Sequence, residues 1–155
     1  MLRVLCIPII PQTAQDAAMD PCFRLYKVMV DQMENIERRR SLLVIEDDET
    51  IRELLKTALE FEGHEVFDAS NGAEGIRMLS KMPVPCLILL DLMMPVMDGW
   101  EFVERLSKDR VYSNIPVIVI TAFCDIGRPI RAKEVVKKPI DLDYLFKVVR
   151  QYCFS

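Results

Sequence analysis

Four segments of the chain consist of an apolar run followed by a charged or hydroxyl side chain: SLLVIEDD, CLILLD, VIVIT and EVVKKP. Such runs are typical of strands in a parallel sheet, which is buried on both faces. The carboxyl ends of these strands lie at one edge, which would gather five residues: Asp47, Asp48, Asp91, Thr121 and Lys138. Three acids held together repel one another unless a cation lies between them. The pattern therefore predicts a metal site at this edge.

Apolar residues at helical spacing alternate with the strands from residue 41 onward. Strands are expected at 42–45, 65–69, 87–90, 117–120 and 134–137, and helices at 51–59, 73–81, 100–107 and 142–152. This alternation predicts an α/β fold, with a doubly wound five-stranded parallel sheet and helices on both faces. Gly127 and Pro129 interrupt the helical pattern before the last strand, so the fourth helix is expected to be short or broken.

The first 40 residues do not share this alternation. The chain is therefore expected to divide into an N-terminal extension, 1–40, and one domain, 41–155. Residues 1–22 mix prolines and small residues without a period, which predicts poor order, whereas the apolar spacing of 23–37 favours a helix. Met33 is an alternative translation start, which would leave MENIERRR as a short leader.

The charge and cysteine content limit the partners and the compartment. The net charge of −4 gives no general attraction to nucleic acid or to an anionic membrane. No apolar run approaches the ~20 residues that span a bilayer. The five cysteines form no CxxC pair, and their number is odd, which favours buried reduced thiols over disulfides or zinc ligands. Reduced thiols in turn predict a cytoplasmic protein.

Each residue of the predicted site also has a simpler structural interpretation. One acid of the pair Asp47 and Asp48 would suffice as a helix N-cap, Thr121 suits a strand, and Lys138 suits a surface. Pro139 restricts residue 138 to extended geometry and permits a cis peptide bond, which would direct the lysine toward the acids. The order and spacing of the segments, more than any one residue, favour a functional site.

The segments VIEDDE, LILLDLMMPVMDGWE, IPVIVITA and KKPID resemble the CheY-like receiver domain of two-component response regulators. The resemblance covers residues 41–153 and implies the strand order 2-1-3-4-5. It implies a phosphoacceptor with slow autodephosphorylation rather than a turnover enzyme. A stand-alone receiver of this kind would take its phosphoryl group from a sensor histidine kinase or phosphotransfer protein. It would signal to a downstream protein by contact, as a monomer or weak dimer.

The resemblance also assigns roles within the site. Asp91 is expected to be the phosphoacceptor, and Thr121 and Lys138 are expected to contact the phosphoryl group. Mg²⁺ is the expected cofactor, because hard oxygen ligands suit it. The expected metal ligands are Asp47 through a water, and Asp48, Asp91 and the backbone carbonyl of Met93 directly.

The sequence departs from the family pattern at two places. Val135 occupies the position of the usual aromatic switch residue, three before Lys138, and the segment from Thr121 to Lys138 is short. These departures predict an atypical switch and keep open a degenerate receiver that binds partners without phosphorylation. Met93 and Phe123, two residues after Asp91 and Thr121, either shield the phosphoryl group from water or pack the loops.

Two other classes of protein fit the sequence less well. An aspartate-nucleophile phosphohydrolase would need a second acid where the chain has Met93. A flavodoxin-type cofactor binder would need a glycine-rich first loop. The only histidine, His64, is interpreted as a turn residue, and Trp100 is interpreted as helix packing.

Overall fold

The computed structural model describes residues 25, 27, 40–122 and 128–154. The predictions for 1–22, Met33 and Phe123 lie outside these residues. Of the helix expected over 23–37, only Leu25 and Lys27 are described, and both have helical geometry. The second of the two compact units of the chain, 39–155, contains every strand that the structure describes.

The described strands form one parallel sheet in the order β2-β1-β3-β4-β5. Their bounds are Ser41–Ile45 for β1, Glu65–Ala69 for β2, Leu87–Asp91 for β3, Val117–Thr121 for β4 and Glu134–Lys137 for β5. Every residue of β1, β3 and β4 is buried, because helices cover both faces of the sheet. The predicted five-stranded, doubly wound fold is confirmed.

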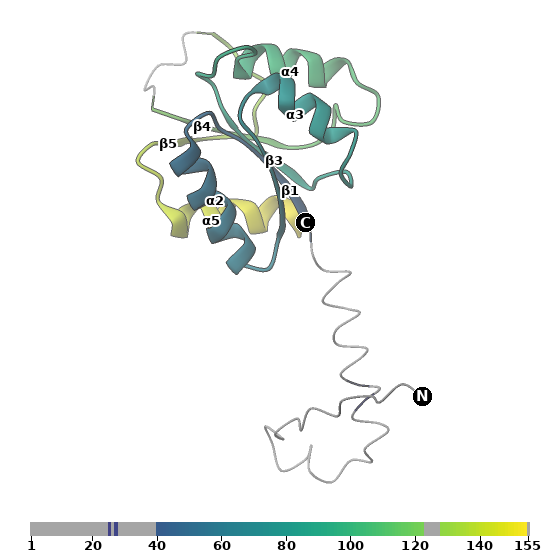
Figure 1. Cartoon of the computed structure of the whole chain (residues 1–155), viewed down its shortest axis with the longest axis vertical. Coiled ribbons are helices and arrows are strands. Elements are labelled where there is room, and N and C mark those ends of the chain that lie inside the picture. Colours follow the sequence, from purple (N-terminus) through teal and green to yellow (C-terminus); the bar gives the residue numbers. More distant parts are fainter. Residues whose placement is uncertain (1–24, 26, 28–39, 123–127, 155) are drawn as a thin grey trace. The chain divides into compact units, whose positions relative to one another are not determined.

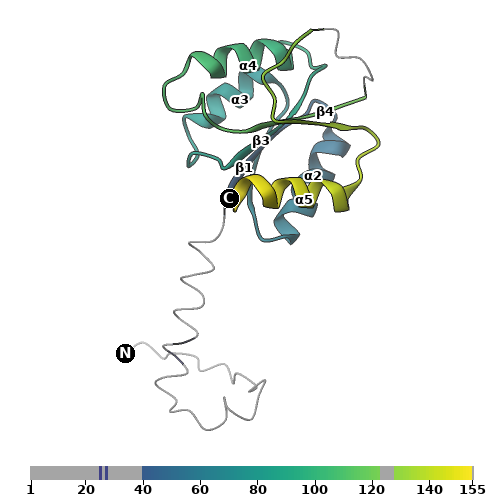
Figure 2. The same ribbon diagram turned by 180° about the vertical axis from the view of Figure 1, so that it is seen from behind.

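The described helices α2, α3, α4 and α5 cover this sheet, with α2 and α5 on one face and α3 and α4 on the other (Figures 1 and 2). Their bounds are Glu49–Phe61 for α2, Gly72–Leu79 for α3, Gly99–Lys108 for α4 and Leu142–Cys153 for α5. Alternate residues of β1 point to opposite faces, so Leu42 packs in the cluster with α2 and α5, while Leu43 packs in the cluster with α3 and α4. The two clusters form the core on either side of the sheet.

The helices begin where side-chain oxygens accept hydrogen bonds from their first turns. Asp48, Asn71, Asp98 and Asp141 are the N-caps of α2, α3, α4 and α5, and each accepts from a backbone N–H three residues later. Each such cap contributes about 1 kcal/mol. The N-cap at Asn71 means that α3 begins at Gly72, one residue before the helix expected over 73–81.

The connection between β4 and β5 lacks a helix within its described part. Residues 128–133 have no helical structure, in agreement with the short or broken helix expected there. Lys133 N–H donates to the carbonyl of Val117, at 2.8 Å, which leads this segment directly into β5. The outer side of α4 therefore borders an extended segment.

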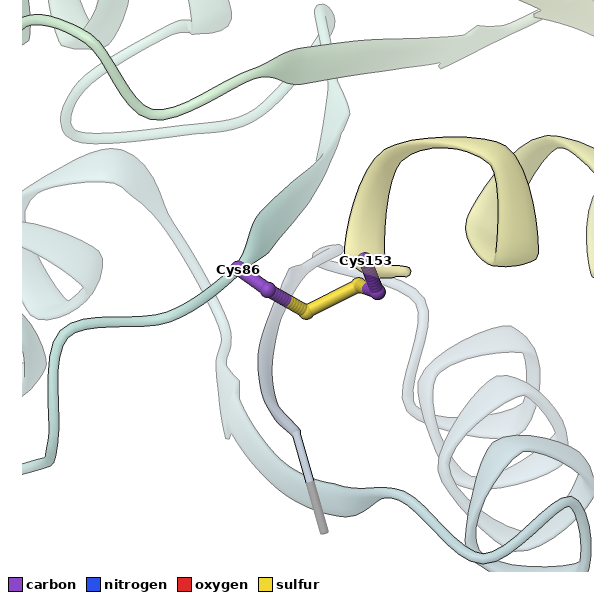
Figure 3. The surroundings of a disulfide bond; sticks show 2 residues. All are labelled: Cys86 and Cys153. Atoms are coloured by element: carbon purple, nitrogen blue, oxygen red, sulfur yellow. A yellow bond between two sulfur atoms is a disulfide. The ribbon is translucent and has the colours of Figure 1, made fainter. Parts of the chain in front are cut away.

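The structure corrects the prediction of reduced thiols for two of the five cysteines. Cys86, just before β3, and Cys153, the last residue of α5, form a disulfide with a Cα–Cα distance of 5.1 Å (Figure 3). They are 67 residues apart, so no local motif marks the pair. The packing of α5 on the sheet brings them together. The other cysteines lie outside the described residues.

Candidate functional site

Asp91 ends β3, the central strand of the sheet, and is only 7% exposed. Its Oδ1 accepts from the N–H of Leu92 at 2.6 Å and from that of Met93 at 3.4 Å. The loop after Asp91 turns back sharply, and Gly99 N–H donates to the carbonyl of Leu92 at 3.0 Å. A Cβ at Gly99 would lie 2.6 Å from the carbonyl oxygen of Asp91, so only glycine fits this approach. The loop thus holds the Asp91 carboxylate at the sheet edge.

Lys138 follows β5 and reaches this carboxylate. Its backbone N–H donates to the carbonyl of Thr121 at 2.9 Å, and its peptide bond to Pro139 is cis. The ammonium lies 3.1 Å from Asp91 Oδ2. Thr121 is fully buried at the end of β4, beside β3. The structure therefore brings together the ends of the three strands that carry Asp91, Thr121 and Lys138.

Glu46 also lies in this site, although the sequence argument did not select it. It follows β1, is 2% exposed, and accepts a hydrogen bond on Oε1 from the Lys138 ammonium at 2.9 Å. Its Oε2 is 2.8 Å from the same ammonium, within ion-pairing distance but without hydrogen-bond geometry. Burial, together with the charge of nearby Asp91, raises the pKa of Glu46 from 4.5 to about 7, against the opposing effect of Lys138.

The same network acts on the lysine. Burial alone would lower the pKa of Lys138, but its hydrogen bonds to Glu46 and Asp91 raise this pKa above the ordinary value. The ammonium therefore stays charged and offsets part of the repulsion between the two buried carboxylates. One cation shared by two acids leaves excess negative charge at the edge.

Three acids at this edge have oxygens close enough to share a metal ion. One carboxylate oxygen from each of Glu46, Asp47 and Asp91 lies within 4.8 Å of the others. Hard oxygen donors of this kind fit Mg²⁺, which keeps several waters as ligands. Asp48 lies outside this group, and its Oδ1 accepts from the N–H of Ile51 at 3.0 Å as the N-cap of α2. The grouped acids thus include Glu46 in place of Asp48.

A signal for this assignment was present in the sequence. The run VIEDDE has three consecutive acids before the helix, and an N-cap requires only one, the last before the first turn. Once the structure gives the start of α2, Asp48 is the cap, and Glu46 and Asp47 remain as candidates for binding an ion.

Two further residues near the site bear on the earlier predictions. Met93 is 53% exposed beside the Asp91 carboxylate, and the role of its carbonyl as a metal ligand stays a prediction. Val135, at the position of the usual aromatic switch residue, is 38% exposed on β5. Only a small side chain is therefore available at the position of the usual switch.

Comparison with known proteins identifies the family. The model of the response regulator receiver domain matches residues 42–150, so the chain belongs to that family. It is 32% identical over 113 residues to the protein PilH of Pseudomonas aeruginosa, which covers 70% of this chain and 93% of PilH. Several curated relatives that are named as transcriptional regulators are longer, and the chain spans less than half of their length.

Solved structures agree with this assignment. The chemotaxis protein CheY4 of Vibrio cholerae is 26% identical and has a TM-score of 0.68, over 74% of this chain and 98% of CheY4. The receiver domain of the sensor histidine kinase PA1611 of Pseudomonas aeruginosa has a TM-score of 0.70 at 20% identity, over 76% of this chain and 99% of that domain. This second likeness shows the fold alone, and that crystal structure has a magnesium ion in the active-site cleft.

Receiver domains accept phosphoryl groups in two-component signalling, and the chain shares their CheY-like fold. None of the described helices is long and apolar enough to cross a membrane.

Proposed function

We propose that the protein accepts a phosphoryl group on Asp91 from a histidine kinase or phosphotransfer protein, in a Mg²⁺-dependent reaction. The observation that carries this proposal is the position of the Asp91 carboxylate. It lies 3.1 Å from a lysine ammonium and shares the sheet edge with two other acids. A carboxylate in this setting is oriented by backbone N–H groups and by a cation, as a nucleophile needs.

In the transfer, an Asp91 oxygen attacks phosphorus in line, the O–P bond forms, and the N–P bond of the donor phosphohistidine breaks. The histidine nitrogen leaves with the electron pair and takes up a proton. Bound Mg²⁺ would supply positive charge at the phosphoryl oxygens. Lys138 would supply a second positive charge, exchanging its contact with Asp91 for one with a phosphoryl oxygen. Thr121 would donate its hydroxyl to the same group.

The proposed metal ligands are Glu46, Asp47 and Asp91, with the backbone carbonyl of Met93. This set replaces the one drawn from the sequence, because the Asp48 carboxylate is already used as a cap. The proposed role of Met93 includes shielding the acyl phosphate from water, since its exposed side chain lies two residues after Asp91.

We further propose that the protein acts as a stand-alone receiver that signals by protein contact, as a monomer or weak dimer. Its proposed location is the cytoplasm, which is supported by membership of the receiver family and no longer by the cysteines, since two of them form a disulfide. The match to PilH supports this proposal, because the receiver domain that the two share covers 93% of PilH. Exposed apolar side chains on α2 support contact with a partner: Leu54 is 53% exposed and Phe61 is 91% exposed. These residues are seven apart and therefore lie on the same side of the helix.

A second candidate is a receiver that binds partners without phosphorylation. Two observations favour it: the described part of the β4–β5 connection lacks a helix, and Val135 replaces the usual aromatic residue. Both affect the transmission of a signal, and neither affects the acid cluster.

Incubation with acetyl phosphate and Mg²⁺, followed by intact-mass measurement, separates the two candidates. We expect a gain of ~80 Da, the mass of one phosphoryl group. The gain should disappear in Asp91→Asn and persist in Asp98→Asn, which changes an acid that only caps α4. If the wild-type protein shows cooperative thermal unfolding and still gains no mass, the result would favour the receiver that binds partners without phosphorylation.

The assignment of the metal ligands is tested by a matched set of variants. Glu46→Gln and Asp47→Asn should raise the Mg²⁺ concentration that gives half-maximal phosphorylation by about tenfold or more. Asp48→Asn should leave this concentration unchanged, because asparagine also caps a helix well. The reverse pattern would restore Asp48 as the ligand and reject Glu46.

A further inference from the structure

The outer side of α4 is hollowed where it faces residues 128–133. Two adjoining cavities, of about 170 Å³ and about 340 Å³, lie between these elements. Val103, Ser107 and Arg131 line both of them. We call this region, formed by α4 and the segment 128–133, the α4 groove. The described residues 128–133 have no helical structure and form one side of it.

The floor of the groove is apolar. Val103, Leu106 and Val117 contribute to it from α4 and β4. Ile130, which is half-buried against the core cluster of α3 and α4, contributes to the second cavity. These side chains offer room for an apolar side chain of a partner and bury it away from water.

The rim of the groove is basic. Arg128, Arg131 and Lys133 line it and are exposed, and no ion pair within the described residues neutralises them. The one acid in the lining, Glu104, pairs with Lys108 at 2.7 Å and also feels the charge of Arg128, so it offsets only part of the positive charge of the rim. An excess of positive charge around an apolar floor is complementary to a segment that carries acids next to an apolar residue.

Trp100 occupies one end of the groove. The Arg128 guanidinium lies 5.6 Å from the centroid of its ring, at a distance typical of a cation–π contact. The indole Nε1 is buried and has no hydrogen-bond partner among the described residues.

We propose that the α4 groove docks an acidic peptide segment of a partner protein. An apolar side chain of the segment packs on Val103 and Ile130, and its carboxylates pair with Arg128 and Arg131. The net charge of −4 on the chain repels a polyanion such as nucleic acid more strongly than a short peptide with a few acids, so the peptide is the better fit to the basic rim. Docking of this kind requires no phosphoryl group, and it adds a surface and a partner chemistry that the function proposed above does not specify.

A random dodecamer peptide library, panned against the full chain without a phosphoryl donor, tests the proposal. We expect the selected peptides to carry net negative charge and at least one large apolar residue. Trp100 is the only tryptophan in the chain, so binding should change the tryptophan emission. Arg131→Glu should raise the dissociation constant of the selected peptides by about tenfold or more.

Arg77→Glu is the matched control, because it reverses an exposed arginine on α3 outside the groove lining. It should bind the peptides as the wild-type protein does. If Arg131→Glu melts at a lower temperature than the wild type, Lys133→Glu is used as a second test variant. Three results would overturn the proposal: selection without enrichment of acids, equal binding by Arg131→Glu and the wild type, or equal competition by single-stranded DNA of twelve nucleotides.

Discussion

At the scale of single residues, Glu46 and Asp48 show how position determines the environment of an acid. They are two residues apart, yet Glu46 is buried beside Lys138 and Asp91, whereas Asp48 is exposed at the start of α2. Burial raises the pKa of Glu46 to about 7, so near neutral pH this side chain exchanges a proton. Glu46 therefore responds to pH in a way that a surface glutamate would not.

This pKa shift makes the stability of the metal-free protein depend on pH. Because the pKa of Glu46 is raised on folding, the folded state holds the proton more tightly than the unfolded state. The protonated Glu46 therefore contributes to the unfolding free energy below pH 4.5, and this contribution is lost as the pH rises through about 7. We expect the unfolding free energy of the wild type, measured with urea and EDTA, to fall relative to that of Glu46→Gln over this range.

His64 is a necessary part of this comparison, because it acts in the opposite direction. It is 7% exposed, which differs from the open turn position expected from the sequence, and burial lowers its pKa below 6.5. Its contribution to stability is lost as the pH falls through and below 6.5. Both proteins in the comparison contain His64, so its contribution cancels. If the unfolding free energies of the wild type and Glu46→Gln changed in parallel with pH, the pKa shift assigned to Glu46 would be contradicted.

Val96, in the loop after Asp91, has a strained backbone. Its φ is 71°, in the left-handed region that disfavours β-branched residues, and its side chain is 83% exposed. Val96→Gly should raise the unfolding free energy by about 1 kcal/mol, because glycine removes this strain at no loss of buried surface. The matched control, Val84→Gly, is also exposed and has no positive φ, so it should not stabilise. Equal effects of the two changes in urea unfolding would reject the assignment of strain.

At the scale of elements, α5 is held to the sheet by packing and by a covalent bond. Leu145, Val148 and Val149 are buried in the cluster that it shares with α2. The disulfide between Cys86 and Cys153 joins the end of the helix to the start of β3. The end of α5 is therefore fixed at the sheet edge opposite the acid cluster.

Reduction of this disulfide should destabilise the domain substantially. A bond that closes a loop between residues 67 apart is worth about 4 kcal/mol, through the lost freedom of the unfolded chain. We expect dithiothreitol to lower the urea midpoint of the wild type. The double variant Cys86→Ala, Cys153→Ala should unfold at the same midpoint with and without reductant. Equal midpoints for the wild type in both conditions would show that the bond does not contribute.

At the scale of the whole molecule, the described core draws only on the receiver domain. Both hydrophobic clusters consist of residues between 42 and 153. A chain that begins at Arg39 should therefore fold with a free energy within about 1 kcal/mol of the full chain, and should accept the phosphoryl group equally well. Urea unfolding and intact mass after acetyl phosphate test both expectations. A larger loss of stability would show that the extension contributes to the domain.

Much of this architecture could be predicted because its signals are local. The apolar strands and amphipathic helices follow from the periods of their own side chains, and parallel strands place Asp91, Thr121 and Lys138 at one edge. It was harder to predict which of the consecutive acids Glu46, Asp47 and Asp48 lie in the site, because this depends on which residue begins α2. The position of that boundary is set by a cap and is uncertain in a sequence by one or two residues.

The sequence by itself determined the strands, the helices and the strand ends that form the site, because periodicity and chain order are enough for these, and its resemblance to receiver domains implied the strand order. Only the tertiary structure decided that Glu46 joins the acids, that Cys86 bonds to Cys153, and that a basic, apolar groove lies beside α4. Each of these depends on the approach of segments far apart in the chain, and such an approach follows from packing and not from local spacing.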